Sequence, residues 1–335
     1  MSHPLSALRD RGRRNWLAQA TACGASLLGG ISFADATYPS KLINILVGFG
    51  PGSAPDILVR VVATELARRI GQPVIVENKP GAAGNLAAAA AAKSPPDGHT
   101  LFYGTNTTHA INPSLYSKLP FDHIRDFEPI TLSGKVWNVL LVNPQSGPKD
   151  FPALVAAAKS RPGQLMFGSG GNGTSLHLTG EMLKQRLGLD MVHVPYKTGE
   201  ASMIDLSGGR IDMLFANTPT ALAHVQSGRL RAIAVTSLQR SAQLPSVPTL
   251  NELGVKDFEV SGWGGFFAPA GTPRKIVDVL HRHLQAILQD PAVVAQMNGW
   301  GVTPQTTSPQ AFAEFIKSET VRWREVIRVS GAKID

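Results

Sequence analysis

Short apolar runs alternate with segments of helical periodicity in the first hundred residues. Residues 42–47 predict a strand, 56–70 predict a helix that ends at Gly71, and 73–77 predict a second strand. An alanine-rich helix after residue 85 and a strand over 100–104 follow. This β-α-β-α-β order predicts a mainly parallel sheet with helices on both faces.

The same alternation returns after residue 150, without a sequence repeat of fixed period. It predicts helices and strands in turn, over 150–160 (helix), 165–169 (strand), 175–187 (helix), 191–195 (strand), 200–206 (helix), 213–215 (strand), 222–227 (helix) and 230–236 (strand). We therefore expect two α/β domains, each a doubly wound sheet.

Two segments are suited to cross between these domains. The apolar runs 130–132 and 136–142 lead into the second domain, and the strand-like stretch 258–268 leads back. Three further helices are expected over 273–288, 291–300 and 309–329. The predicted boundaries are a signal peptide over 1–36, a first domain of 37–138 plus 262–335, and a second domain of 139–261.

The first 36 residues have the pattern of a secretory signal peptide. Four arginines precede the uncharged apolar stretch 16–33, and Ala34-Asp35-Ala36 is a cleavage signal. The pair Arg13-Arg14 resembles a twin-arginine signal, with ordinary Sec export as the alternative. An uncleaved anchor and a lipoprotein attached at Cys23 fit the pattern less well. We expect cleavage near Ala36 and a periplasmic protein.

The composition of the exported part excludes several kinds of chemistry. Cys23, the only cysteine, lies in the signal peptide, so the mature chain is expected to have no disulfide and no thiolate site. The formal charge of +8 falls to +6 when residues 1–36 are removed. The basic residues that remain are scattered and do not alternate with aromatic residues, so no nucleic-acid partner is expected.

No motif for metal, nucleotide triphosphate or serine-hydrolase chemistry occurs in the chain. His109, His177 and His193 lack the spacing of metal ligands, and we expect neither a metal nor a cofactor. The segment Gly168-x-Gly170-x-x-Gly173 matches the dinucleotide fingerprint, but no acidic residue ends the next strand to hold a ribose. Two other interpretations of this turn are that it binds a small carboxylate and that it has only a structural role.

The predicted strands end in small polar residues and glycines. These ends are Gly52-Ser53-Ala54, Thr105-Asn106, Ser169 to Ser175, Tyr196 and Asn217-Thr218. Ligands of open α/β sheets bind at the carboxyl ends of the strands, and helix N-termini there attract anions. Neutral donors without a nucleophile indicate a binding protein rather than an enzyme.

Sequence motifs spread over the mature chain resemble the Bug family, the periplasmic receptors of tripartite tricarboxylate transporters. They include Phe49-x-Pro51-Gly52-x-x-x-Asp56, Gly71-Gln72-Pro73-Val74-x-Val76-Glu77-Asn78, Pro80-Gly81-Ala82-x-Gly84-Asn85, Gly170-x-x-Gly173-Thr174-Ser175-x-His177 and His193-Val194-Pro195-Tyr196-Lys197. The resemblance implies a type II periplasmic binding protein, two α/β domains that close like a flytrap. It also implies a monomer that captures a di- or tricarboxylate, an acidic amino acid or an aromatic acid for membrane permease subunits.

The resemblance also implies which residues contact the ligand. They are Gly52, Ser53, Ala54, Asp56, Thr105, Asn106 and His109 in the first domain, and Ser169, Asn172, Thr174, Ser175, Tyr196 and Asn217 in the second. Two positions depart from the family pattern. Pro55 removes a backbone donor from a loop that is usually glycine-rich, and Ala216 stands where many members carry an acid. The second departure argues against a ligand with an ammonium group.

Two other functions remain open from the sequence. One is a periplasmic hydrolase or lyase that uses Ser175 or Ser169 with His177 or His109. The other is a sensor that binds the same ligand and docks on a signalling receptor.

Overall fold

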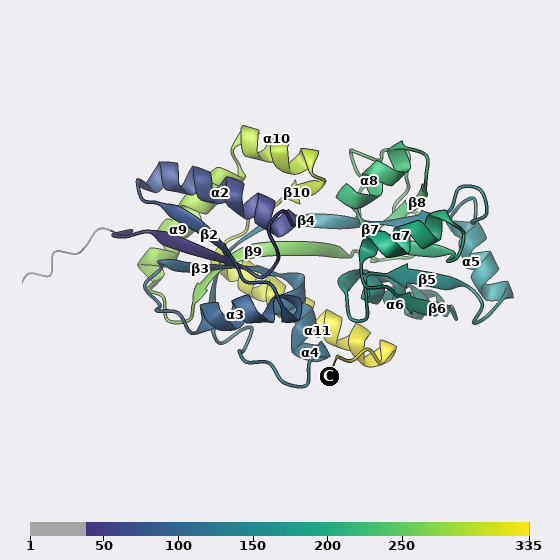
Figure 1. Cartoon of the computed structure of the whole chain (residues 1–335), viewed down its shortest axis with the longest axis horizontal. Coiled ribbons are helices and arrows are strands. Elements are labelled where there is room, and N and C mark those ends of the chain that lie inside the picture. Colours follow the sequence, from purple (N-terminus) through teal and green to yellow (C-terminus); the bar gives the residue numbers. More distant parts are fainter. Residues whose placement is uncertain (1–37, 335) are drawn as a thin grey trace, which may run out of the picture. The chain divides into compact units, whose positions relative to one another are not determined.

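The computed structural model of the chain describes residues 38–334 (Figure 1). Residues 41–334 belong to one compact unit, which contains every helix and strand named below. The predicted signal peptide and its cleavage point lie outside the described residues. Over residues 38–334, no helix combines the length and the apolar character needed to cross a membrane.

The first part of the chain forms the predicted parallel βαβαβ arrangement. Its elements are β1 (Ile43–Val47), α2 (Ala54–Ile70), β2 (Val74–Asn78), α3 (Asn85–Ala92) and β3 (Thr100–Thr105). Strand β1 lies between β2 and β3 and pairs in parallel with both. Gly71 ends α2 in the left-handed conformation (φ 68°), which only glycine adopts without strain.

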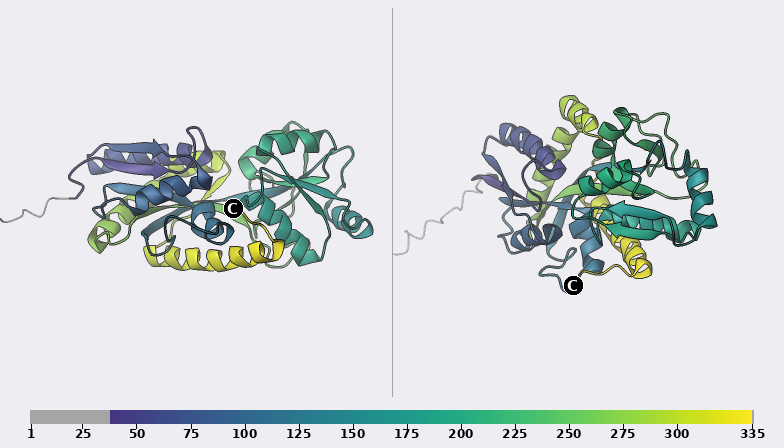
Figure 2. Two further views of the ribbon diagram at one scale, coloured as in Figure 1. Left: turned by 60° about the horizontal axis from the view of Figure 1, so that its bottom comes forward. Right: turned by 45° about the vertical axis from the view of Figure 1, so that its right-hand side comes forward.

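Two long strands connect the two parts of the chain (Figure 2). Strand β4 (Phe127–Val142) unites the two apolar runs seen in the sequence, and β9 (Ser261–Pro269) pairs with it in antiparallel fashion. β9 also pairs with β3, while the far end of β4 pairs with strands of the second part. The short strand β10 (Val302–Pro304), which the sequence did not predict, adds to β4.

The second part repeats the α/β alternation. Its elements are α5 (Phe151–Ser160), β5 (Met166–Ser169), α6 (Ser175–Leu187), β6 (Val192–Pro195), α7 (Gly199–Ser207), β7 (Met213–Asn217), α8 (Thr218–Gln226) and β8 (Arg231–Val235). β5 pairs in parallel with β6 and β7, and β7 and β8 pair antiparallel to β4. Helix α8 begins earlier than predicted, because Pro219 lies in its first turn, where a missing N–H removes no helical bond.

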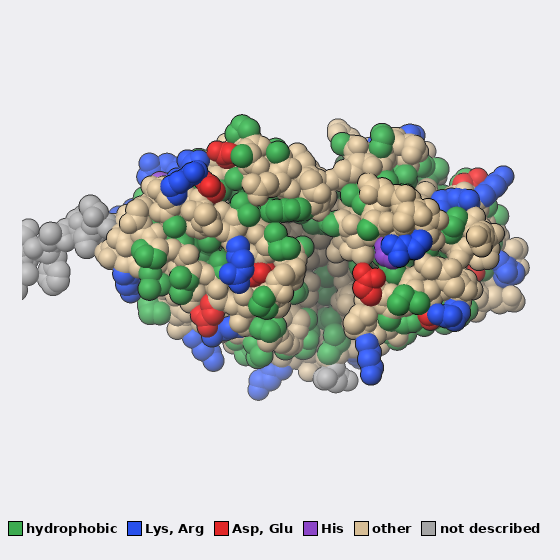
Figure 3. All heavy atoms as spheres, turned by 45° about the horizontal axis from the view of Figure 1, so that its top comes forward, with side chains coloured by type: hydrophobic (Ala, Val, Ile, Leu, Met, Phe, Trp, Pro, Cys, Tyr) green, Lys and Arg blue, Asp and Glu red, His purple; other side chains and the backbone are tan. Residues whose placement is uncertain are grey.

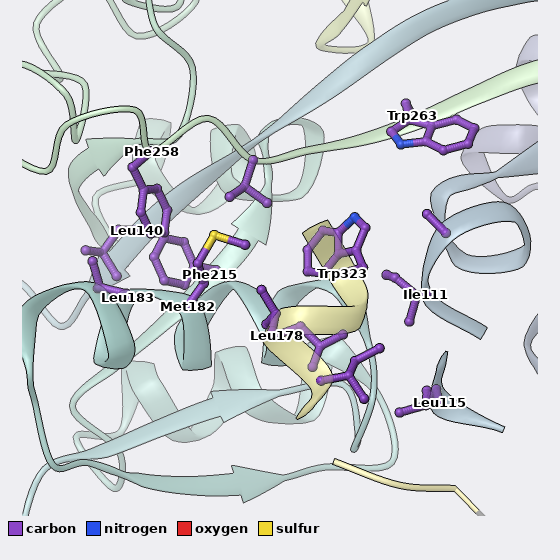
Figure 4. Close-up of a cluster of buried hydrophobic side chains, with 14 of the residues drawn as sticks. Ile111, Leu115, Leu140, Leu178, Met182, Leu183, Phe215, Phe258, Trp263 and Trp323 are labelled. Carbon is purple, nitrogen blue, oxygen red and sulfur yellow. The ribbon is translucent and has the colours of Figure 1, made fainter. Parts of the chain in front are cut away.

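Three helices complete the chain, α9 (Arg274–Leu288), α10 (Pro291–Gly299) and α11 (Pro309–Ser330). Helix α11 packs against both parts, since it contacts the segment that follows β3 as well as α6. Its Trp323 is fully buried in a hydrophobic cluster that also includes Ile111 and Leu178 (Figure 4). One apolar core therefore runs from the first part of the chain through α11 into the second.

Candidate functional site

A cavity of about 390 Å³ lies at the carboxyl ends of β3 and β7 and at the starts of α2 and α6. The space-filling view shows the surface hollowed between the two parts of the chain (Figure 3). Its polar lining residues are Thr105, Asn106, Thr107, Asn112, Asn172, Thr174, Ser175 and Asn217. Its apolar and aromatic lining residues include Phe49, Leu58, Tyr103, Leu115, Val136, Trp263, Val302 and Ile334. None of the described lining residues is charged or a histidine.

The loop between β1 and α2 forms part of the first wall. Ala54 and Pro55 line the cavity, whereas Gly52 and Ser53 lie outside its lining. Ser53 is the N-cap of α2, but its side chain makes no capping bond, and its buried hydroxyl has no partner in the described chain. Pro55 lies in the first turn of the helix, so it costs α2 no hydrogen bond.

The carboxylate of Asp56 is turned into this loop and away from the cavity lining. It accepts hydrogen bonds from the backbone N–H of Gly52 (2.8 Å) and from Asn78 Nδ2 (2.8 Å), and it pairs with Arg60. Burial alone would raise the pKa of Asp56, but the bonds from Arg60, Gly52 and Asn78 lower it below its usual value. Asp56 therefore shapes the loop as an ionised carboxylate at the start of α2.

The segment after β3 continues as a helical turn over Thr107–Ile111. Thr108 Oγ1 accepts a bond from the N–H of Thr105 (3.1 Å) and holds the turn Thr107–Ile111 against the strand end. The side-chain atoms Thr105 Oγ1 and Asn106 Nδ2 are buried and have no hydrogen-bond partner among the described residues. Both residues line the cavity, so both can serve a ligand.

His109 lies behind this turn and not in the cavity lining. Its ring is fully buried, stacks on Phe267 with ring centroids 4.0 Å apart, and places Nδ1 3.0 Å from Thr108 Oγ1. Burial, with a smaller effect of His123, holds the pKa of His109 well below its ordinary value. We interpret His109 as a neutral core residue that supports the turn.

The second wall is the loop between β5 and α6. Asn172, Gly173, Thr174 and Ser175 line the cavity. Thr174 caps α6, since its hydroxyl accepts from the N–H of His177 (3.3 Å) and donates to the carbonyl of Gly171 (2.9 Å). The backbone N–H groups at the start of α6 thus lie at the cavity, and no acidic residue follows in the first turn.

Ser169 and two histidines hold this loop from behind. Ser169 Oγ lies 2.7 Å from His193 Nε2 and also bonds the backbone of Gly171. His177 Nδ1 accepts from the N–H of Gly173 (3.1 Å), and its ring stacks on that of His193 with centroids 3.8 Å apart. Burial and the charge of Lys184 lower the pKa of His177 to about 4, and burial, His177 and Lys184 lower that of His193 to about 3.

These contacts bear on the serine–histidine pair considered from the sequence. Ser169 lies within hydrogen-bond distance of His193, and the described contacts include no hydrogen bond from Ser169 to His177 or His109. Within residues 38–334 no carboxylate hydrogen-bonds to His193, and Ser169 lies outside the cavity lining. The third member of a catalytic triad is thus absent from the described contacts of this pair.

Of the two remaining predicted contact residues, Asn217 lines the cavity and Tyr196 does not. The hydroxyl of Tyr196 donates to Asp205 Oδ2 (2.7 Å) outside the cavity lining, and burial together with Asp205 raises the pKa of Tyr196 to about 12. Asn217 ends β7, precedes α8 and lines the cavity. The structure therefore gathers Ala54, Thr105, Asn106, Asn172, Thr174, Ser175 and Asn217 around one cavity. It places Gly52, Ser53, Asp56, His109, Ser169 and Tyr196 outside its lining.

Sequence reasoning missed the apolar side of the cavity. Val136 and Trp263 come from the crossing strands β4 and β9, and Val302 comes from β10. No local motif marks these residues, because the face that each presents depends on strand pairing. The pairing of β4 with β9 shifts register twice, between Pro129 and Thr131 and between Leu132 and Gly134.

Two α/β halves, two crossing strands and a cavity at the strand ends define a periplasmic solute-binding protein fold. Residues 58–332 match the model of the tripartite tricarboxylate transporter family receptors, and the chain belongs to this family. It is 38% identical to the protein BugT of Bordetella pertussis (strain Tohama I) over 299 residues, which cover 89% of this chain and 92% of BugT.

Solved structures agree with this assignment. R. palustris Rpa4515 with adipate is 31% identical with a TM-score of 0.77, covering 88% of this chain and 99% of that one. MatC from Rhodopseudomonas palustris with bound malate is 29% identical with a TM-score of 0.73, covering 87% of this chain and 100% of that one. The predicted family and fold class are confirmed, and the family is one of periplasmic solute-binding proteins.

Proposed function

We propose that the protein captures a small organic acid in this cavity and delivers it to the membrane permease subunits of a tripartite tricarboxylate transporter. The observation that carries the proposal is the second wall, where the start of α6 brings Thr174 and Ser175 to the cavity without an acidic neighbour. Backbone N–H groups and the helix dipole stabilise a carboxylate at such a position.

The fold suggests how binding would be coupled to delivery. We propose the domains predicted from the sequence, 37–138 plus 262–335 and 139–261, with β4 and β9 as the hinge between them. A ligand that contacts both walls favours the closed form over the open form by its additional contacts. A permease or a signalling receptor can then recognise closure, and co-purification of the protein with permease subunits distinguishes the two partners.

We expect organic acids to stabilise the purified protein against heat. A ligand at about 100 times its Kd adds about 2.7 kcal/mol to the free energy of unfolding, which is a rise of several degrees in Tm for a protein of this size. Thermal unfolding with a panel of carboxylates, neutral sugars and cations measures this. Mass spectrometry of the bound acid after incubation also tests for turnover. Stabilisation by no acid, or conversion of the acid, would contradict the proposal.

Ser175→Ala should weaken binding of the acid by about tenfold or more, since a hydrogen bond to a charged group contributes about 1.5–3 kcal/mol. Ser175 is half-buried in the first turn of α6, and its side chain is outside the hydrophobic core, so Tm without ligand should not change. Calorimetry measures the affinity. Ser160→Ala, on the exposed end of α5, is the matched control. An unchanged affinity of Ser175→Ala would place the carboxylate elsewhere.

A further inference from the structure

We infer that the cavity selects an acid with a single carboxylate and an apolar body over di- and tricarboxylates. The carboxylate lies on the second wall, at the start of α6, and the body lies on the first wall and the crossing strands. This inference rests on the proposed function and narrows its ligand class. It sets the chain apart from its relatives with bound adipate and malate.

The two walls differ in their suitability for a carboxylate. On the second wall, α6 and α8 both begin at the cavity, and neither has an acidic residue in its first turn. On the first wall, α2 begins with Pro55, which has no N–H, and with the ionised Asp56, which already occupies the N–H of Gly52. A carboxylate at the start of α2 would find fewer donors and a negative charge close by.

A second carboxylate finds no counter-charge in the cavity. Among the described lining residues there is no Lys, Arg or His. Arg60 is committed to Asp56, and Lys135 on β4 pairs with Glu259 (3.1 Å) and lies over the ring of Trp137. Removing a second charge from water without such a partner is costly.

The aromatic residues of the lining present carbon rather than polar atoms. The hydroxyl of Tyr103 bonds Ser133 Oγ (2.9 Å), and Trp263 Nε1 donates to Glu319 Oε2 (3.0 Å). Their polar groups are therefore satisfied inside the protein, and only ring surface is left for a ligand. Phe49, Val136 and Val302 extend this apolar surface, which gains free energy by covering an apolar body and none by covering a charge.

Two neutral polar groups on the first wall are available to the ligand. Thr105 Oγ1 and Asn106 Nδ2 lack partners in the described chain, and their residues are only 7% and 5% exposed. A buried polar group without a bond is unfavourable, so a ligand that bonds them gains affinity. Their neutrality suits a hydroxyl or carbonyl group carried on the apolar body.

Pairs of acids that differ by one carboxylate test the inference directly. Calorimetry near neutral pH compares hexanoate with adipate and benzoate with terephthalate, with malate and citrate added to the panel. We expect the monoacid of the better-bound pair to bind at least about tenfold more tightly than its diacid. Equal or tighter binding of adipate, terephthalate, malate or citrate overturns the inference and leaves the proposed function standing. Binding of none of the acids overturns both.

A substitution on the apolar side provides a second readout. Phe49→Ala should weaken monoacid binding by about tenfold and reduce the preference over the diacid, because it removes ring surface from the cavity. Phe49 is not part of the buried core, so the unfolding midpoint without ligand should be retained. Ile204→Ala, an exposed residue on α7 outside the lining, is the control. An unchanged preference in a folded Phe49→Ala protein would contradict the placement of the body.

Discussion

Replacement of Glu319 by alanine is expected to lower the free energy of unfolding by about 3–5 kcal/mol, because two buried indole N–H groups would lose their acceptor. Glu319 lies on α11 and is 7% exposed. Its Oε2 accepts hydrogen bonds from the indole Nε1 of Trp263 (3.0 Å) and of Trp323 (3.1 Å), and its Oε1 pairs with Arg322.

The expected loss of stability in Glu319→Ala follows from the hydrogen-bond donors that alanine would leave without an acceptor. Two buried indole N–H groups would lose their acceptor, and each such loss costs about 1–3 kcal/mol. Trp263 belongs to a crossing strand and lines the cavity, while Trp323 fills the core between the two parts of the chain. One carboxylate therefore joins helix α11, the crossing strand β9 and the lining of the cavity.

Urea unfolding followed by circular dichroism measures the loss in Glu319→Ala. Glu319→Gln keeps the size and one carbonyl oxygen, so it should be about half as destabilising, since one acceptor can still serve the indoles. Glu314→Ala removes an exposed ion pair with Lys317 from the same helix and should cost less than about 1 kcal/mol. A loss in Glu319→Ala no larger than that of Glu314→Ala would show that the two indole bonds contribute little.

His177→Ala is expected to lower ligand affinity by more than about tenfold, the equivalent of about 1.4 kcal/mol. Nδ1 of His177 accepts from the N–H of Gly173, and this bond fixes the loop that lines the second wall. Gly173 has a positive φ of 75°, a conformation that glycine adopts without strain. His177 lies outside the cavity lining, and we interpret it as a positioning residue.

Conservative variants of His177 distinguish a role in positioning the loop from a role in packing alone. His177→Asn places an oxygen close to the position of Nδ1 and should retain most of the affinity, whereas His177→Gln places its oxygen near Nε2 and should not. Calorimetry with the best-bound acid measures all three variants. Equal affinities of the Asn and Gln variants would exclude the bond to Gly173 as the cause, and so would full affinity in His177→Ala.

From the hydrogen bond between the N–H of Gly173 and His177 Nδ1, we predict how pH affects stability and ligand binding. The pKa of His177 is lowered from 6.5 to about 4 in the folded state, chiefly by burial and further by Lys184. The neutral ring therefore contributes stability that is fully present above about pH 6.5 and is lost as pH falls towards 4. A protonated Nδ1 cannot accept from Gly173, so ligand affinity should fall only near pH 4, where the ring takes up its proton in the folded protein. His177→Asn should remove that part of the pH dependence, while Glu181 and His193 stay in place around it.

Much of the architecture could be predicted from the chain alone. Alternating strand and helix patterns predicted the parallel arrangement of β1, β2 and β3, and the glycine-rich turn after β5 predicted a helix start suited to an anion. These features depend on local periodicity, capping and turn chemistry, which neighbouring residues express without the rest of the fold. The resemblance to the Bug family extended this to the two-domain fold.

The orientation of individual side chains was decided only by the tertiary structure. Asp56, Ser169 and Tyr196 stand at strand ends or helix starts, as predicted, yet each bonds a neighbour inside its own part of the chain. Conversely, Val136 and Trp263 come from the paired strands β4 and β9 and line the cavity, although no local motif marks them. Local sequence determined where strands end and helices begin. Which atoms face the ligand depends on pairing and burial between segments far apart in the chain, and no local pattern encodes that.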